Sequence, residues 1–194
     1  MMLGRHAAWG LACAVILTMA SESLAAQRLE VGGAVGLAMP IREFHGVANI
    51  GLEEAAMVKF QPGTAPVSIR LDFIHARFGG RAAPGLIFPR TRTTGVAGGA
   101  EYDFDGGDES RWRGWAFGGL GAFYTIADQG TPEIPPFGRT YFGIQAGIGG
   151  AYRMGLLNPF VELRYATIYR SNAKVKTLPL LIGIRLGRRA SDLY

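Results

Sequence analysis

Two histidines, His45 and His75, are the side chains best suited to acid–base chemistry beyond the N-terminal apolar segment. His45 follows Glu43 in a polar stretch, and His75 lies in a run of alternating apolar and polar residues. Nucleophilic catalysis needs a hydroxyl or thiol beside such a base, and an acid to orient it. Neither histidine begins a His-x-Ser spacing; after His75, for example, residue 77 is arginine. We therefore expect no catalysis from either side chain.

Motifs for metals and cofactors are also missing from the sequence. The single cysteine, Cys13, lies in the N-terminal apolar run, so the rest of the chain offers no disulfide and no thiolate ligand. Gly118 to Phe123 (GGLGAF) is rich in glycine, but it falls inside a strand-like segment and does not open a helix. It is therefore not a phosphate-binding loop. We expect no metal and no cofactor.

Charged residues of both signs share one face of the strand-like segments. They are Glu30, Lys59, Arg70, Asp72, Glu101, Asp103, Arg153, Glu162, Arg164 and Arg185, five basic and five acidic. On a soluble barrel such a row would be a solvated surface. Inside a narrow closed barrel the opposite charges would neutralise one another, as they must, because an unpaired buried charge is costly.

A second basic group lies at the end of the predicted barrel that carries the longer connections, which we expect to be the outer end. It comprises Arg77, Arg81, Arg90, Arg92, Arg139, Arg170, Lys174 and Lys176. Arginine binds phosphate with two parallel hydrogen bonds. We expect these residues to contact the phosphates of lipopolysaccharide if this end of the protein lies in an anionic leaflet; a merely solvated rim is the alternative.

Eight segments, in which apolar and polar residues alternate with period two, must position these side chains. In residues 66–76, for example, Val67, Ile69 and Leu71 share one face, and Ser68 and Arg70 the other. Turn signals separate the segments, and the connections are longer at one end. We predict an all-β, eight-stranded antiparallel up-and-down transmembrane barrel, without helices, with strands near 28–38, 52–60, 66–76, 92–104, 112–125, 139–153, 159–169 and 175–187.

The first residues have the features of an export signal. Arg5 and His6 precede an apolar run, residues 11–19, and small residues follow at 23–26. The run is too short for a membrane-spanning helix, which needs ~20 residues. We predict a signal peptide over residues 1–26 and a barrel domain over 27–194. An exported protein would not meet nucleic acid, so the net charge of +5 does not indicate a nucleic-acid partner.

Aromatic residues concentrate toward the ends of the segments, which favours a membrane barrel over a soluble one. If the first strand starts in the periplasm, one belt lies near the periplasmic ends and a second near the outer ends. The first contains Phe60, Tyr102, Phe104, Trp112, Trp115, Tyr152 and Phe160; the second contains Phe73, Phe78, Phe123, Tyr124, Tyr141, Phe142, Tyr165 and Tyr169.

The chain resembles the small eight-stranded outer-membrane barrels, the group of opacity-type porins and OmpA/OmpX-like proteins. The resemblance rests on segments such as VGGAVGLAMP, PVSIRLDFIHARF, FGIQAGIGGAYRM and LPLLIGIRLG in that order. It implies location in the outer membrane, insertion by the barrel assembly machinery, and contact with outer-membrane lipid and lipopolysaccharide, as a monomer. We expect a structural or surface-interaction role without catalysis, although a lipid-modifying enzyme and a soluble periplasmic lipocalin-like barrel remain alternatives.

Overall fold

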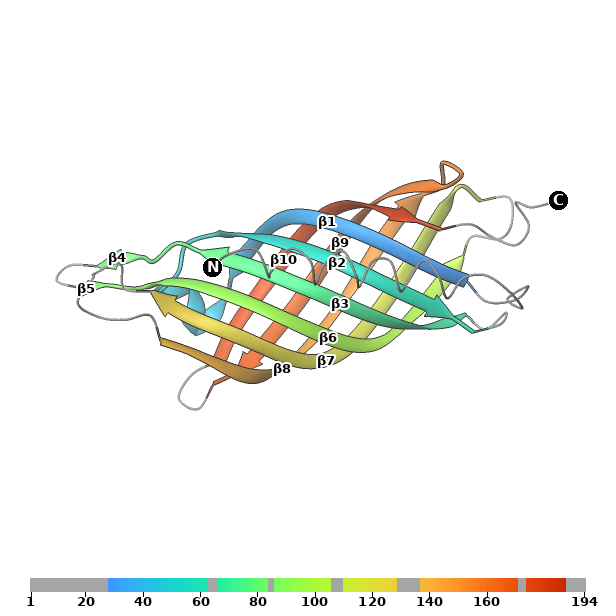
Figure 1. Cartoon of the computed structure of the whole chain (residues 1–194). Coiled ribbons are helices and arrows are strands. Elements are labelled where there is room, and N and C mark those ends of the chain that lie inside the picture. The colour runs from blue at the N-terminus through green and yellow to red at the C-terminus, as the bar shows by residue number, and fades with distance from the viewer. Residues whose placement is uncertain are drawn as a thin grey trace, which may run out of the picture.

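The computed structural model describes residues 28–62, 66–83, 86–105, 110–128, 137–170 and 174–187. The predicted signal peptide, residues 1–26, lies outside this part of the chain. Figure 1 shows long tilted strands that wrap into a single barrel. Within the described residues, no helix is long and apolar enough to cross a membrane.

Eight long strands close the barrel, each antiparallel to the next along the chain. They are β1 (Arg28–Pro40), β2 (Gly51–Gln61), β3 (Val67–Phe78), β6 (Arg90–Asp105), β7 (Trp112–Asp128), β8 (Phe137–Tyr152), β9 (Leu157–Tyr169) and β10 (Lys174–Leu186). The order around the barrel is β1-β10-β9-β8-β7-β6-β3-β2, and β1 also pairs with β2, so no edge is left open. The predicted fold class is confirmed, and the strand bounds lie close to those expected from the alternation.

The two ends of the barrel differ in their connections. At the end where β1 stops, which we call the long-loop end, residues 42–46 form a 3-10 helix, η1 (Arg42–Gly46). The same end carries the small hairpin of β4 (Ala82–Ala83) and β5 (Leu86–Ile87), seen to the left in Figure 1. The opposite end is the short-turn end. The prediction of no helix was wrong over 42–46, because five residues are too few to show helical periodicity.

Along most of each strand the side chains alternate between lumen and exterior. Ile69 and Ile182 point outward and are 62% and 59% exposed, whereas Arg70 and Arg185 point inward and are 2% exposed each. This is the reverse of a soluble barrel and is the arrangement of a barrel in lipid. On β6, the outward stretch from Phe104 to Thr94 rises ~25 Å at the usual ~40° tilt, which is the height of a lipid-facing band.

The predicted aromatic belts need a correction. Tyr102, Phe104 and Trp112 do point outward near the short-turn end, and Phe73, Tyr124, Phe142, Tyr165 and Tyr169 point outward toward the other end. Trp115, Phe160, Phe78 and Phe123 instead point into the lumen and are at most 5% exposed. The belts were assigned by how far along its strand each residue lies. Successive strand residues point to opposite faces, so the face depends on whether the position is odd or even.

Lumen-facing glycines make room for these inward rings. Trp115 is the register partner of Gly149, and Phe117 that of Gly147. A Cβ at Gly149 would overlap the Trp115 ring, and one at Gly147 would lie 2.5 Å from the Phe117 ring. The glycine-rich β8 is therefore the wall on which bulky side chains of β7 rest.

Candidate functional site

The short-turn half of the lumen contains a network of buried ion pairs, and Glu101 lies at its centre. This carboxylate is fully buried and accepts hydrogen bonds from Lys59 at 2.9 Å, from Arg70 at 2.8 Å, and from Arg185 at 2.8 and 3.1 Å. The donors come from β2, β3 and β10, so one side chain of β6 joins three other strands across the lumen. Arg185 also stacks on Trp115, with its guanidinium carbon 3.6 Å from the ring centroid.

Glu162 of β9 forms a second centre on the opposite wall. It is fully buried and accepts two bonds from Arg70 at 2.8 and 3.0 Å, one from Arg164 at 2.8 Å and one from the Trp115 indole at 3.1 Å. Arg70 also binds Asp72 on its own strand at 2.8 Å. Every oxygen of Glu162 therefore meets a donor, which compensates for its removal from water.

Arg113 links a third group of charges near the short-turn end. It donates to Glu30 at 2.5 Å and to Asp103 at 2.9 and 3.1 Å, and Asp103 also accepts from Lys59 at 2.5 Å. The sequence analysis did not include Arg113. Its position two residues before Trp115 places it on the lumen face, but β7 is apolar on both faces, so its alternation did not reveal which face points inward.

Nine of the ten charged residues named from the sequence point into this network, and the tenth, Arg153, lies elsewhere. β8 ends at Tyr152, and Arg153 donates to the Ser110 carbonyl at 2.9 Å in the neighbouring turn. Arg153 therefore follows the last residue of β8 and binds the turn beside it.

Two further lumen residues were not foreseen. Gln145 donates to Asp72 at 2.8 Å. Glu53 is only 3% exposed, and its Oε1 lies 3.6 Å from Nη1 of Arg164. This oxygen has no hydrogen-bond partner. With Glu53 and Arg113 included and Arg153 left out, the described lumen holds six acidic and five basic side chains, where the sequence analysis expected five of each.

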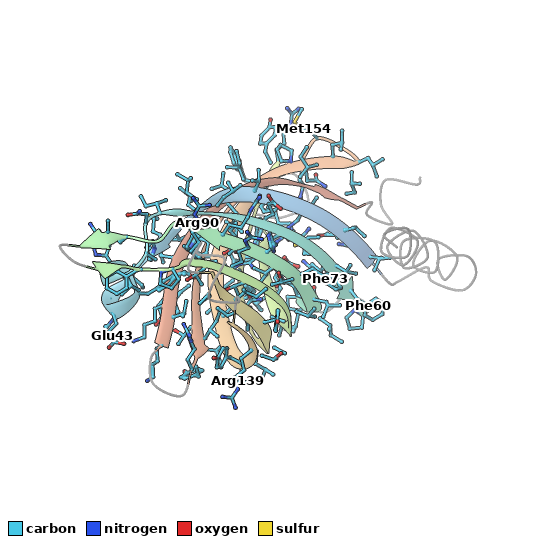
Figure 2. All side chains as sticks on the ribbon, turned by 60° about the vertical axis from the view of Figure 1, so that its left-hand side comes forward. Glu43, Phe60, Phe73, Arg90, Arg139 and Met154 are labelled. Carbon is cyan, nitrogen blue, oxygen red and sulfur yellow. The ribbon has the colours of Figure 1, made fainter. Side chains whose placement is uncertain are left out.

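The long-loop half of the lumen contains an apolar cluster and buried threonines such as Thr93 and Thr125 in place of an ion-pair network, which differs from the expectation of a lumen filled by paired charges. Its buried cluster includes Ile74, Phe78, Phe123, Ile168 and Val175. Phe44 of η1 covers the cluster and meets the Phe78 ring edge-on at 5.0 Å. The space left between this cluster and Glu53 is about 20 Å³, room for about one water molecule. Figure 2 shows side chains throughout the barrel, with Glu43 and Phe60 marking opposite ends.

The eight basic residues predicted to contact lipopolysaccharide lie around the long-loop end, but not as one cluster. Arg77 pairs with Glu54, and both are exposed. Arg81 donates to the His45 carbonyl at 2.8 Å, and Arg90 is the register partner of Asp128. Arg92 points outward beside Arg77. Arg170 and Lys174 lie over the rings of Tyr141 and Tyr169, each at 5.5 Å, while Arg139 is exposed and Lys176 half-buried.

The two histidines lie at the same end. His75 points outward from β3 and shares a 2.8 Å hydrogen bond between its Nδ1 and the Thr94 hydroxyl of β6. Glu54 is its register partner on the other side. Glu54, His75 and Thr94 therefore lie side by side in one row. Sequence spacing could not reveal this row, because three strands contribute to it. No three histidine, cysteine or acidic side chains of the described residues gather as a metal site.

No protein-family model matches the sequence, and no curated protein matches it. Solved structures do match. Neisserial surface protein A is 16% identical, with a TM-score of 0.58 over 82% of this chain and 96% of that one. A major outer membrane protein from Thermus thermophilus is 12% identical, with a TM-score of 0.57 over 84% and 99%.

The outer membrane protein OprG from Pseudomonas aeruginosa is likewise 12% identical, with a TM-score of 0.55 over 84% of this chain and 95% of that one. At these identities the likeness concerns the fold, and the inward charges and outward apolar band agree with it. The chain thus has the fold of the small eight-stranded outer-membrane β-barrels.

Proposed function

We propose that the protein is an integral outer-membrane barrel that is closed to solutes and serves a structural or surface-interaction role. The observation that carries this proposal is the filled lumen. Ion pairs occupy its short-turn half, and an apolar cluster under Phe44 occupies its long-loop half. A barrel of this size has an interior just wide enough for its own side chains.

The long-loop end would carry any surface interaction. Its basic side chains suit the phosphates of lipopolysaccharide and other outer-membrane lipid, which we propose as partners. Insertion by the barrel assembly machinery and a monomeric state are also part of the proposal. A closed barrel supports the monomer, because it leaves no strand edge to pair with a second chain.

Two measurements on the refolded mature chain test this function. A membrane barrel should migrate faster on a detergent gel before boiling than after it, and should remain in the membrane fraction. Reconstituted in a planar bilayer, it should give no stable ion conductance, while an open porin prepared in parallel should conduct. Stable conducting channels would contradict a filled lumen, and a chain soluble in plain buffer would contradict the membrane location.

One observation favours a second function, a lipid-modifying enzyme. The row Glu54–His75–Thr94 has the acid, imidazole and hydroxyl order of a nucleophilic site, at the level of lipid headgroups. Among the described residues, however, Glu54 bonds to Arg77 and leaves the imidazole without an orienting acid. Mass spectrometry of lipid A from expressing cells distinguishes the two functions. If lipid A loses an acyl chain, and cells expressing His75→Ala do not show this loss, the enzyme is established.

A further inference from the structure

The turn that joins β8 to β9 at the short-turn end has an apolar tip. Met154 and Leu157 form an isolated antiparallel bridge, and Gly155, with a φ of 74°, allows the tight reversal between them. Partners in such a bridge share one face of a sheet, so Met154 points outward with Leu157. Met154, Leu156 and Leu157 are 63%, 50% and 51% exposed, and we call these three side chains the apolar tip.

The other two turns of this end differ from it in sequence. Residues 106–109, between β6 and β7, read GGDE and carry two carboxylates, and residues 62–66, between β2 and β3, read PGTAP. Gly, Pro, Asn, Asp and Ser are the usual residues of a turn surrounded by water. Three neighbouring large apolar side chains are therefore particular to the β8–β9 turn, and they indicate a contact other than water.

The apolar tip continues the outward wall of the barrel without a polar interruption. Leu157 is the register partner of Leu186 on β10, which is also exposed. The next outward residues toward the membrane centre are Pro159 and Val161 on β9 and Ile184 on β10, all of them exposed. The surface that meets acyl chains thus extends to the tip, and membrane lipid is the contact that fits it.

Aromatic side chains beside the tip indicate its depth in the membrane. Trp112 is 66% exposed and meets the Tyr152 ring edge-on at 5.1 Å, and Arg111 donates to the Tyr152 hydroxyl at 3.2 Å. Such side chains lie at the level of the lipid headgroups. Met154, two residues beyond Tyr152, is ~7 Å further along the chain and ~5 Å further along the membrane normal at the usual ~40° tilt. The headgroup layer of one leaflet is ~5–7 Å thick, so this distance keeps the tip inside the layer.

We propose that the apolar tip inserts into the lipid leaflet at the short-turn end, at the boundary between headgroups and acyl chains, and anchors the barrel there. Apolar side chains of membrane-surface segments bury themselves at this same boundary. The inference deepens the proposed function and rests on membrane insertion, but it does not depend on a closed lumen.

Fluorescence of the refolded chain in phosphatidylcholine vesicles locates the tip. The sequence after residue 26 contains no cysteine, so Met154→Cys and Pro62→Cys each provide one site for an environment-sensitive fluorophore. Pro62 is the matched control, because it is exposed and its turn lies across the barrel, with two strands between the two turns on either side.

The two labels should respond oppositely to two quenchers. A lipid with a nitroxide on its acyl chain next to the headgroup should quench the label at position 154 more strongly than the label at position 62. Iodide in the water should quench the label at position 62 more strongly. The reverse order would overturn the insertion of the tip. A label at position 154 that is shielded from both quenchers would show a contact between copies of the chain and overturn the assignment to lipid.

The double variant Met154→Asp/Leu156→Asp tests whether the tip stabilises the inserted barrel. It should lower the equilibrium constant for folding into vesicles about tenfold, because two apolar side chains leave the lipid. The control Pro62→Asp/Pro66→Asp adds the same charge to the opposite turn, where both prolines are exposed, and should change this constant little. Equal losses in the two double variants would contradict an anchor at the tip.

Heat-modifiable mobility of every variant separates this inference from the proposed function. An inserted barrel whose tip lies in water contradicts only the insertion of the tip, whereas a chain that does not insert contradicts the proposed function as well.

Discussion

Glu162 offers a direct test of whether the ion pairs of the lumen stabilise the barrel. Substituting Glu162→Gln keeps the shape of the side chain and removes its charge. The carboxylate is fully buried and accepts from Arg70, Arg164 and Trp115. A glutamine has one acceptor oxygen, and its amide N–H groups would face the donors of two guanidinium groups.

The expected loss of stability follows from the ion-pair partners that remain to the two arginines. Removing one member of a buried pair costs roughly 3–5 kcal/mol. Arg70 keeps Asp72 and Glu101, and Arg164 keeps weaker contacts, so we expect a loss near the lower limit, about 3 kcal/mol. A domain of this kind has a free energy of unfolding of only about 5–15 kcal/mol, so this loss is a large share.

Glu53→Gln is the matched control. Glu53 is buried to a similar degree, but its one ion-pair partner among the described residues, Arg164, lies 3.6 Å away, and its Oε1 accepts no hydrogen bond. In a lumen with one acid in excess, its neutralisation should cost clearly less stability than that of Glu162, because no hydrogen bond to Oε1 is lost.

The assay is reversible urea unfolding of the refolded barrel in lipid vesicles, followed by the fluorescence of Trp115. The reporter is isolated by replacing Trp112 with phenylalanine in every variant; this residue points outward and is 66% exposed. Equal midpoints for Glu162→Gln and Glu53→Gln would refute the reasoning, because the number of hydrogen bonds to each carboxylate would then have no energetic consequence.

Two further predictions concern Gly149 and Arg113. Gly149→Ala places a methyl group inside the contact distance of the Trp115 ring and should cost about 1–3 kcal/mol in the same assay, whereas Gly33→Ala, where a Cβ meets nothing within 4 Å, should be close to neutral. Arg113→Gln removes the hydrogen-bond donor of Glu30 and one of the two donors of Asp103, and should lower the unfolding midpoint clearly. Arg153→Gln, at the turn, should lower it much less; the reverse ranking would show that the network is wrongly delimited.

The sequence determined the number of barrel strands, their approximate bounds and their two-faced character. Val67, Ile69 and Leu71 alternate with Ser68, Arg70 and Asp72 so regularly that one face had to be apolar and the other polar. Period-two alternation is a local property, so a single chain suffices to read it. The asymmetry of the connections, from which the two ends were predicted, is equally local.

Only the tertiary structure decided which side chains meet across the lumen. Arg70 of β3 reaches Glu162 of β9, 92 positions away in sequence, because the closed barrel brings opposite walls together. The division into a charged half and an apolar half has the same origin, since Phe44 enters the lumen from a short helix outside the strands. The contact between Trp115 and Gly149, and the opposition of Arg77 and Arg92, depend on strand register. Register is fixed by pairing between strands, and no single strand carries that information.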